Sequence, residues 1–74
     1  MSKPTRITNS IRALRFAHGE MTQAQLAERI GVTRQTIIAI EQGRYDPSLP
    51  LAIKMARFFG LAVEEVFHVD GEAR

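Results

Sequence analysis

The sequence predicts an all-α fold, a compact bundle of five helices. Apolar residues recur at three- and four-residue intervals in most segments, as on the buried stripe of an amphipathic helix. Hydroxyl side chains that can cap a helix stand at the start of three segments: Thr22, Thr33 and Ser48. Glycines, which end helices at little steric cost, follow four of the segments: Gly19, Gly31, Gly43 and Gly60.

Length and composition limit the class of protein. Seventy-four residues make one domain, near the size at which a core is barely sufficient, and a hydrophobic fraction of 45% favours a folded chain. The absence of cysteine excludes disulfides and suits a reducing cytoplasm. No apolar run approaches the about 20 residues of a membrane span, and the start, MSKPTRITN, lacks the apolar region of a signal peptide. We expect a cytoplasmic protein.

The sequence offers no catalytic or metal site. Its two histidines, His18 and His68, are far apart in the chain, and no carboxylate pair lies beside an expected pocket. The same shortage of ligands argues against a bound metal. We therefore expect no enzymatic activity and no cofactor.

The first helix is expected from about Ile7 or Thr8 to His18. Ile7, Ile11 and Leu14 repeat at helical spacing and predict a core-facing stripe. The expected boundaries are an N-terminal arm at 1–6, a folded domain at 7–68 and a C-terminal tail at 69–74.

The segment from Met21 to Gly43 predicts two short helices joined by a tight glycine turn. Thr22 and Gln25 have the spacing of a capping box. Ala27, one turn before Gly31, is small enough to let the two helices approach at the angle of a helix-turn-helix. The outward residues at the start of the later of these two helices, the third of the bundle, are Arg34, Gln35 and Thr36, side chains suited to hydrogen bonding.

The rest of the chain predicts two more helices. Ser48 would cap the fourth, with Pro50 tolerated in its first turn. Val63 to Phe67 would form the last. The expected inner stripe of the fourth helix is Leu49, Ala52, Met55, Ala56 and Phe59.

These motifs resemble a known family. Leu26, Ala27, Ile30, Gly31, Val32, Ile37 and Ile40 have the spacing of the Cro/repressor-type (Xre) helix-turn-helix, and the continuation IEQGRYDPSLPLAIKMARFFGLAVEEVF is also similar. The resemblance covers roughly Thr8 to Phe67. It implies a lambda-repressor-like bundle whose second and third helices form the helix-turn-helix, and a sequence-specific DNA-binding transcriptional regulator, with repression as the expected action.

The resemblance also implies which residues would contact bases. The helix that starts after Thr33 would enter the major groove, where Arg34 can donate two hydrogen bonds to guanine and Gln35 can pair with adenine. Thr36 is a weaker candidate that suits phosphate better, and Ala39 could touch a thymine methyl. Ile38 departs from the family, where relatives often carry a polar residue, and two interpretations are open: a contact with thymine, or a half-buried side chain.

Phosphate contacts are implied on both sides of the groove. Thr22 and Gln23 lie at the start of the second helix, and Gln23 matches the family's backbone-gripping glutamine. The positions expected to face the opposite lip of the groove are Thr33, Gln42 and Arg44. Lys3 and Arg6 in the arm could also reach DNA, although a disordered terminus is the simpler interpretation.

Charge is distributed in a way that fits docking on phosphate. Up to Arg44 seven basic residues oppose three acidic ones, a balance of +4, whereas from Tyr45 onward three basic residues oppose five acidic ones, a balance of −2.

The family further implies a structural pair and a dimer. Arg15 and Glu41 match an arginine and a glutamate that pair in related repressors; the alternative is two independent solvated charges. A dimer would read a palindromic operator. The surplus apolar residues suggested for its interface, or for ordinary packing, are Leu51, Phe58, Phe67 and Val69.

One rival function remains at this point. The same fold can serve an antitoxin-like or adaptor protein that holds a partner protein. Because antitoxins of this fold usually bind their own operator as well, the two functions are compatible.

Overall fold

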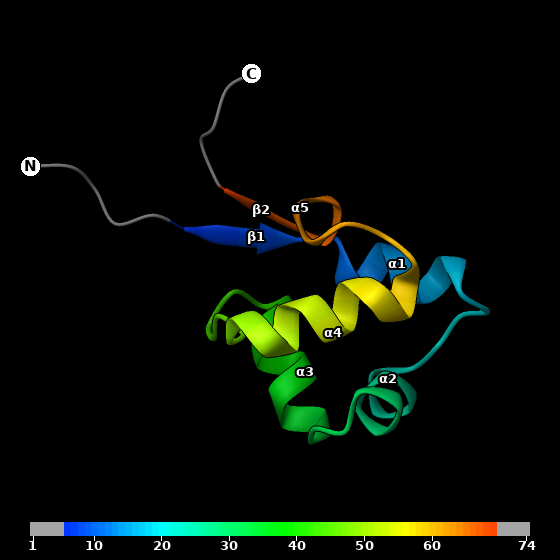
Figure 1. The fold of residues 1–74 in the computed structure, drawn as a ribbon. Coiled ribbons are helices and arrows are strands. Elements are labelled where there is room, and N and C mark those ends of the chain that lie inside the picture. The colour runs from blue at the N-terminus through cyan, green and yellow to red at the C-terminus, as the bar shows by residue number, and fades with distance from the viewer. Residues whose placement is uncertain (1–5, 70–74) are drawn as a thin grey trace, which may run out of the picture.

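The computed structural model describes residues 6–69, and in that range five helices and one short two-stranded sheet follow one another (Figure 1). The elements in chain order are β1 (Ile7–Asn9), α1 (Ile11–Ala17), α2 (Gln23–Ile30), α3 (Arg34–Glu41), α4 (Leu49–Phe59), α5 (Val63–Val66) and β2 (Phe67–Val69). Of the predicted arm and tail, residues 1–5 and 70–74 lie outside the described residues, and so does Lys3.

The two strands make the prediction of an all-α fold an overstatement. β1 and β2 pair antiparallel, with Ile7 opposite Val69, Thr8 opposite His68 and Asn9 opposite Phe67. The first helix therefore begins at Ile11 and not at Ile7 or Thr8, and Val69 belongs to a strand and not to the predicted tail. The spacing of Ile7 and Ile11 suits a helix, but the partner strand lies about 60 residues away in the chain and leaves no local signal.

Asn9 connects this ribbon to the helices on either side. Its Oδ1 accepts a hydrogen bond from the backbone N–H of Ile11 at 3.1 Å, at the start of α1. Its Nδ2 donates to the carbonyl oxygen of Ile40 at 2.9 Å, near the end of α3. One amide thus satisfies a donor of α1 and an acceptor of α3.

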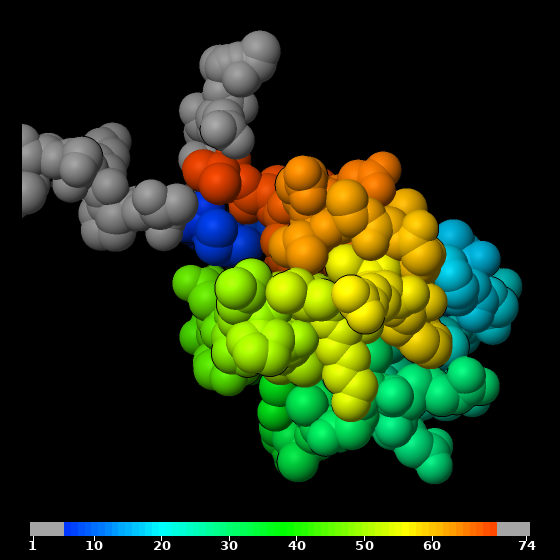
Figure 2. Space-filling view, in the orientation of Figure 1, coloured from blue at the N-terminus to red at the C-terminus, as the bar shows by residue number. Residues whose placement is uncertain are grey.

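Helix α4 lies between the β1–β2 ribbon on one side and the α2–α3 pair on the other (Figure 1). Its side chains fill the centre of the face drawn in Figure 2. Ser48 Oγ accepts from the backbone N–H of Leu51 at its start, and Gly60 ends it with a φ of 73°, as predicted. None of the helices between residues 6 and 69 has the length and the apolar character that spanning a bilayer requires.

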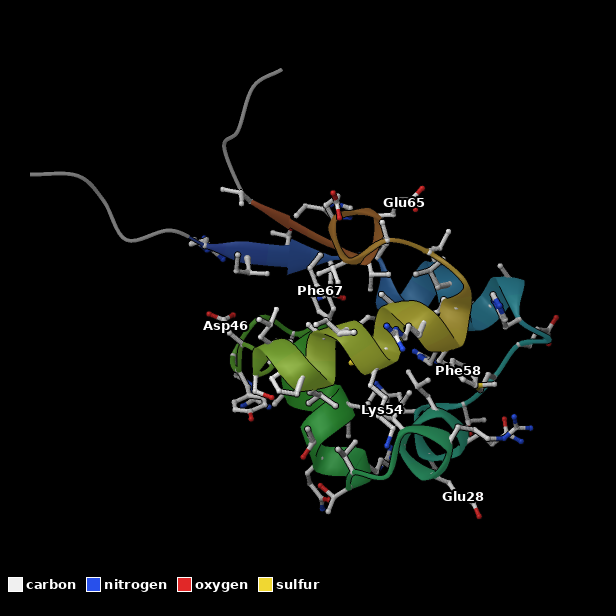
Figure 3. All side chains as sticks on the ribbon, viewed as in Figure 1. Glu28, Asp46, Lys54, Phe58, Glu65 and Phe67 are labelled. Atoms are coloured by element: carbon white, nitrogen blue, oxygen red, sulfur yellow. The ribbon has the colours of Figure 1, made fainter. Side chains whose placement is uncertain are left out.

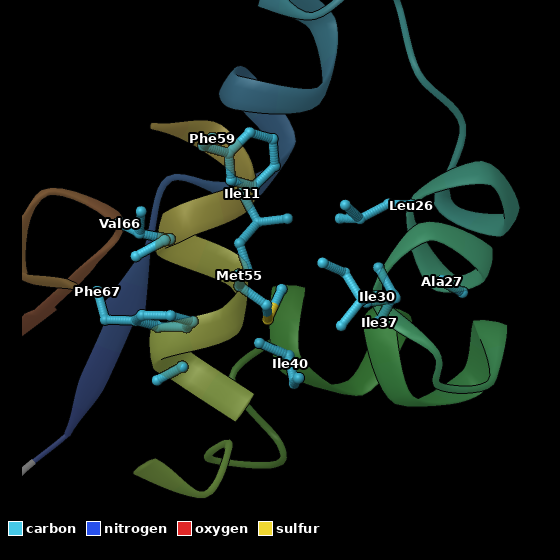
Figure 4. Close-up of a cluster of buried hydrophobic side chains, with 12 residues drawn as sticks. Ile11, Leu26, Ala27, Ile30, Ile37, Ile40, Met55, Phe59, Val66 and Phe67 are labelled. Atoms are coloured by element: carbon cyan, nitrogen blue, oxygen red, sulfur yellow. The ribbon is translucent and has the colours of Figure 1, made fainter. Parts of the chain in front are cut away.

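One hydrophobic core draws on every helix and on β2 (Figure 4). Burial of each large apolar side chain contributes roughly 1.5–3 kcal/mol, which the entropy of ordering the chain largely offsets. The members are Ile11, Leu26, Ala27, Ile30, Ile37, Ile40, Ala52, Met55, Ala56, Phe59, Val66 and Phe67.

Two predicted positions differ from this core. Leu49 was expected on the inner stripe of α4, but it opens that helix, projects beyond the cluster and is 69% exposed. Phe67 was suggested for a dimer interface, but it is only 8% exposed and packs in the core (Figure 4). Its strand position turns the ring inward, so Phe67 is not available to a second copy.

Candidate nucleic-acid interface

Helices α2 and α3 form the predicted helix-turn-helix. Thr22 Oγ1 accepts from the backbone N–H of Gln25 at 3.0 Å, and Gln25 Oε1 accepts from that of Thr22 at 2.9 Å, so the capping box is present. At the other end Gly31 has a left-handed φ of 91°, and the N–H groups of Gly31 and Val32 both donate to the carbonyl of the buried Ala27. These bonds fix where α2 ends and hence where α3 can start.

Lys54 of α4 lies beside this turn. A Cβ added to Gly31 would stand 3.5 Å from Lys54 Nζ, and Figure 3 shows the lysine reaching from α4 toward α2 and α3. An ammonium group near the end of α2 is favourable, because the last carbonyls of a helix carry partial negative charge. The lysine therefore supports the turn from the side of α4.

The first turn of α3 presents two long polar side chains to solvent. Thr33 caps the helix, because its Oγ1 accepts from the backbone N–H of Thr36 at 3.2 Å. Arg34 and Gln35, the first two residues of α3, are both exposed. The α2–α3 pair lies on the side of α4 away from the ribbon, so neither strand covers this surface (Figure 1).

Thr36 and Ala39 lie deeper than Arg34 and Gln35. Both are partly buried, and the hydroxyls of Thr36 and Thr33 are 3.0 Å apart. In that bond one of the two hydroxyls donates its hydrogen to the other. Only the accepting hydroxyl therefore keeps a hydrogen that it can donate to a ligand. Ile38 is also partly buried.

A buried ion pair joins α1 to the end of α3. Arg15 Nε donates to Glu41 Oε2 at 2.6 Å and Nη2 to Oε1 at 3.1 Å, and each side chain is 8% exposed. Arg15 Nη1 also donates to the carbonyl of Met21 at 2.7 Å, and Gln23 Nε2 donates to Glu41 Oε1 at 3.2 Å. The pair thus fixes α1, the start of α2 and the end of α3 relative to one another.

Three of the residues predicted to contact phosphate line one hollow. It has a volume of about 500 Å³, and its walls come from α1 and from the facing ends of α2 and α3. The lining residues are Arg12, Arg15, Phe16, Thr22, Gln23, Glu41 and Gln42. Gln42 therefore lies with Thr22 and Gln23, and not with the group expected on the opposite lip of the groove.

Thr33 and Arg44 do not line this hollow. Thr33 lies at the start of α3, one helix length from Gln42. Arg44 is exposed just beyond the end of α3, where its backbone N–H donates to the carbonyl of Ala39 at 2.9 Å. Among the arm residues, only Arg6 is described, and it is exposed.

The dimer candidates differ in how much surface they offer. Leu51 and Phe58 are partly buried against the core. The centroid of the Phe58 ring lies 5.2 Å from that of the Phe59 ring and 6.3 Å from that of the His18 ring. Val69, in β2, is exposed.

Three exposed side chains were missed by the sequence analysis: Phe16, Tyr45 and Leu49. Phe16 had a usable signal, because it is an apolar residue that falls outside the stripe formed by Ile11 and Leu14. Tyr45 lies between α3 and α4, where no periodic pattern indicates burial or exposure.

Comparison with known proteins agrees with this arrangement. A family model described as helix-turn-helix matches residues 11–66. An uncharacterised HTH-type transcriptional regulator of Methanocaldococcus jannaschii is 54% identical over 59 residues, which are 80% of this chain and 88% of that protein. The cryptic phage CTXphi transcriptional repressor RstR of Vibrio cholerae is 34% identical over 59 residues, which are 80% of this chain and 52% of the repressor.

A solved structure supports the fold independently. A crystal structure from Bacteroides fragilis aligns with a TM-score of 0.71 over 84% of this chain and 98% of that one. Because the two sequences are only 24% identical, the likeness concerns the fold alone.

Proposed function

Because the chain belongs to the helix-turn-helix family of DNA-binding transcriptional regulators, we propose that it reads a specific double-stranded DNA sequence in the major groove with α3. The observation that carries this proposal is the exposed pair Arg34 and Gln35 on the first turn of α3. A recognition helix contacts base edges with its N-terminal residues, and these two side chains stand there without cover.

Each side chain has a chemically matched base. The planar guanidinium of Arg34 can donate two parallel hydrogen bonds to O6 and N7 of guanine, and the amide of Gln35 can pair with N6 and N7 of adenine. Ala39, one turn further on, would lie against a thymine methyl. Thr36 is partly buried and has a shorter side chain, and it would contact phosphate.

The proposed grip on the DNA backbone has two parts. Thr22, Gln23 and Gln42 share the hollow beside α1, and would hold one phosphate strand. Thr33 and Arg44 would hold the strand across the groove. Contacts of this kind set the orientation of the protein on the duplex and do not select a sequence.

We further propose that two copies bind one palindromic operator. A single module contacts only a few base pairs, whereas two copies related by a two-fold axis would contact half-sites about 34 Å apart, one turn of the duplex. Val69, with the exposed edges of Leu51 and Phe58, is the remaining part of the suggested interface. Sedimentation that finds only monomer, both free and on DNA, would contradict this dimer.

Repression is the regulatory action that we propose. A small domain that occupies its operator blocks access to the DNA, and the similarity to the CTXphi repressor points the same way. A protein acting in this way would be cytoplasmic, and associated with the nucleoid while bound.

Selection of bound duplexes from a random pool tests the proposed sequence specificity, the palindrome and the half-site spacing together. We expect enrichment of a palindrome with half-site centres one helical turn apart. A parallel selection with the Arg34→Ala variant should show no base preference at one position of each half-site, while the spacing of the half-sites stays unchanged. A pool that shows no enrichment, with the chain folded, would contradict sequence-specific binding and favour the protein-partner alternative.

A further inference from the structure

Phe16 of α1 is an exposed aromatic side chain flanked by two arginines. The residue is half exposed, at 50%. The Cζ atom of Arg12 lies 5.7 Å from the ring centroid and that of Arg15 lies 5.5 Å from it. These distances lie within the range in which a guanidinium is attracted to an aromatic face.

The two arginines differ in what else they do. Arg15 is buried, and its N–H groups donate to the carboxylate of Glu41 and to the carbonyl of Met21. Arg12 is exposed, one turn before Phe16, and its guanidinium lies over the Phe16 ring. Arg12 is therefore the arginine with donors to offer to a ligand.

Arg12 and Phe16 form a ridge between two hollows. On one side is the hollow of about 500 Å³ that also contains Thr22, Gln23 and Gln42. On the other side is a hollow of about 480 Å³, lined by Asn9, Ser10, Arg12, Ala13 and Phe16. The ridge thus stands directly beside the three polar residues proposed to hold one phosphate strand.

We propose that Arg12, held in place by the Phe16 ring, binds a DNA backbone phosphate and makes α1 a third contact element. The inference rests on the proposed function and extends the phosphate grip beyond α2 and α3. A guanidinium presents paired N–H donors that match phosphate oxygens. Because the ring already restricts the side chain, less conformational freedom is lost when phosphate binds.

The charge around the first hollow suits this ligand. Glu41 is the acidic residue in its lining, and an unpaired carboxylate there would repel phosphate. Arg15 and Gln23 both donate to that carboxylate, so its charge is compensated inside the protein. Arg12 then supplies the uncompensated positive charge at the edge of the hollow.

The test uses the full chain and its selected duplex, titrated at several salt concentrations. Arg12→Ala should weaken binding roughly fivefold to tenfold near 0.1 M salt, because one phosphate contact and its released counterion are lost. The slope of log K against log salt should fall by about 0.9. Arg29→Ala is the matched control: Arg29 is exposed at the far end of α2, so the variant carries the same charge change away from the hollow.

Two further measurements separate a phosphate contact from a change in net charge. Phosphate ethylation interference identifies the phosphates whose modification prevents binding. With Arg12→Ala, one such phosphate per half-site should no longer matter, and the others should still be required. Phe16→Leu should also weaken binding, but it should add nothing in the Arg12→Ala background, because the ring acts through Arg12. Thermal unfolding of each variant checks that the exposed substitutions leave the fold intact.

The outcomes distinguish this inference from the proposed function. If the parent chain binds a specific duplex and Arg12→Ala matches Arg29→Ala in affinity, slope and interference pattern, the contact by α1 is wrong and the proposed function stands. If the parent chain selects no DNA, the proposed function itself fails. Binding of Arg12 to an acidic protein segment with no effect on DNA binding would also overturn the inference.

Discussion

Arg15 and Glu41, 26 positions apart in the chain, form a two-point ion pair: Nε to Oε2 at 2.6 Å and Nη2 to Oε1 at 3.1 Å. Since both side chains are nearly buried, removal of one partner leaves the other charge in a poorly solvated site. The pair links the helix that carries Arg12 to the helix that carries Arg34, so it bears on both stability and DNA binding.

Arg15→Ala and Glu41→Ala should each lower the free energy of unfolding by about 3 kcal/mol, because each leaves an uncompensated buried charge. The double variant should lose clearly less than the sum, because neither charge remains. Urea unfolding of the four proteins measures the coupling. Strictly additive losses would mean that the two charges act independently.

Arg34→Ala should cost about 1–3 kcal/mol of binding free energy to the preferred duplex and relax discrimination at one base pair. Titration against a panel of duplexes with single base changes measures both effects. The expected pattern is a loss confined to one position of each half-site. An equal loss on every duplex would identify Arg34 as a backbone contact instead.

Arg44→Ala should behave differently, because Arg44 is proposed to hold phosphate. We expect weaker binding by a similar factor on preferred and altered duplexes, with the salt slope reduced by about one unit. The same titrations, repeated at several salt concentrations, provide the measurement. If the Arg44 and Arg34 variants lose the same base preference, the division between base and phosphate contacts is wrong.

Asn9→Ala should lower the free energy of unfolding by about 1–3 kcal/mol, because it deprives Ile11 N–H and Ile40 carbonyl of a partner. Asn9→Asp keeps the acceptor for Ile11 but loses the donor to Ile40, so it should be destabilised as well. Thr8→Ala, at an exposed position of the same strand, is the control and should change stability by less than about 0.5 kcal/mol.

Chemical denaturation of the three Asn9 and Thr8 variants gives the comparison. An Asn9→Asp protein as stable as the parent would show that the bond between Asn9 and the Ile40 carbonyl does not help to hold α3 against the ribbon. If Thr8→Ala lowers the free energy of unfolding as much as Asn9→Ala does, the loss reflects any change in this strand and not the two hydrogen bonds of Asn9.

The helix-turn-helix could be predicted because its signals are local. The Thr22–Gln25 capping box, the left-handed Gly31 and the Thr33 cap each involve groups within about four residues of one another. Such contacts follow from residue type and spacing alone. Helical periodicity likewise predicted that Arg34 and Gln35 would face outward, away from Ile37 and Ile40.

The tertiary structure alone decided the remaining features. The β1–β2 ribbon, the inward turn of Phe67 and the exposure of Leu49 depend on segments that are distant in sequence. The hollow that brings Arg12 of α1 beside Gln23 and Gln42 depends on how three helices pack. The sequence by itself determined where α2, α3 and α4 begin and end, because the capping hydrogen bonds and left-handed glycines that set these ends form between residues within one helical turn. Which surfaces meet, and where α1 begins, depends on pairing and on the burial of apolar side chains from the whole chain at once.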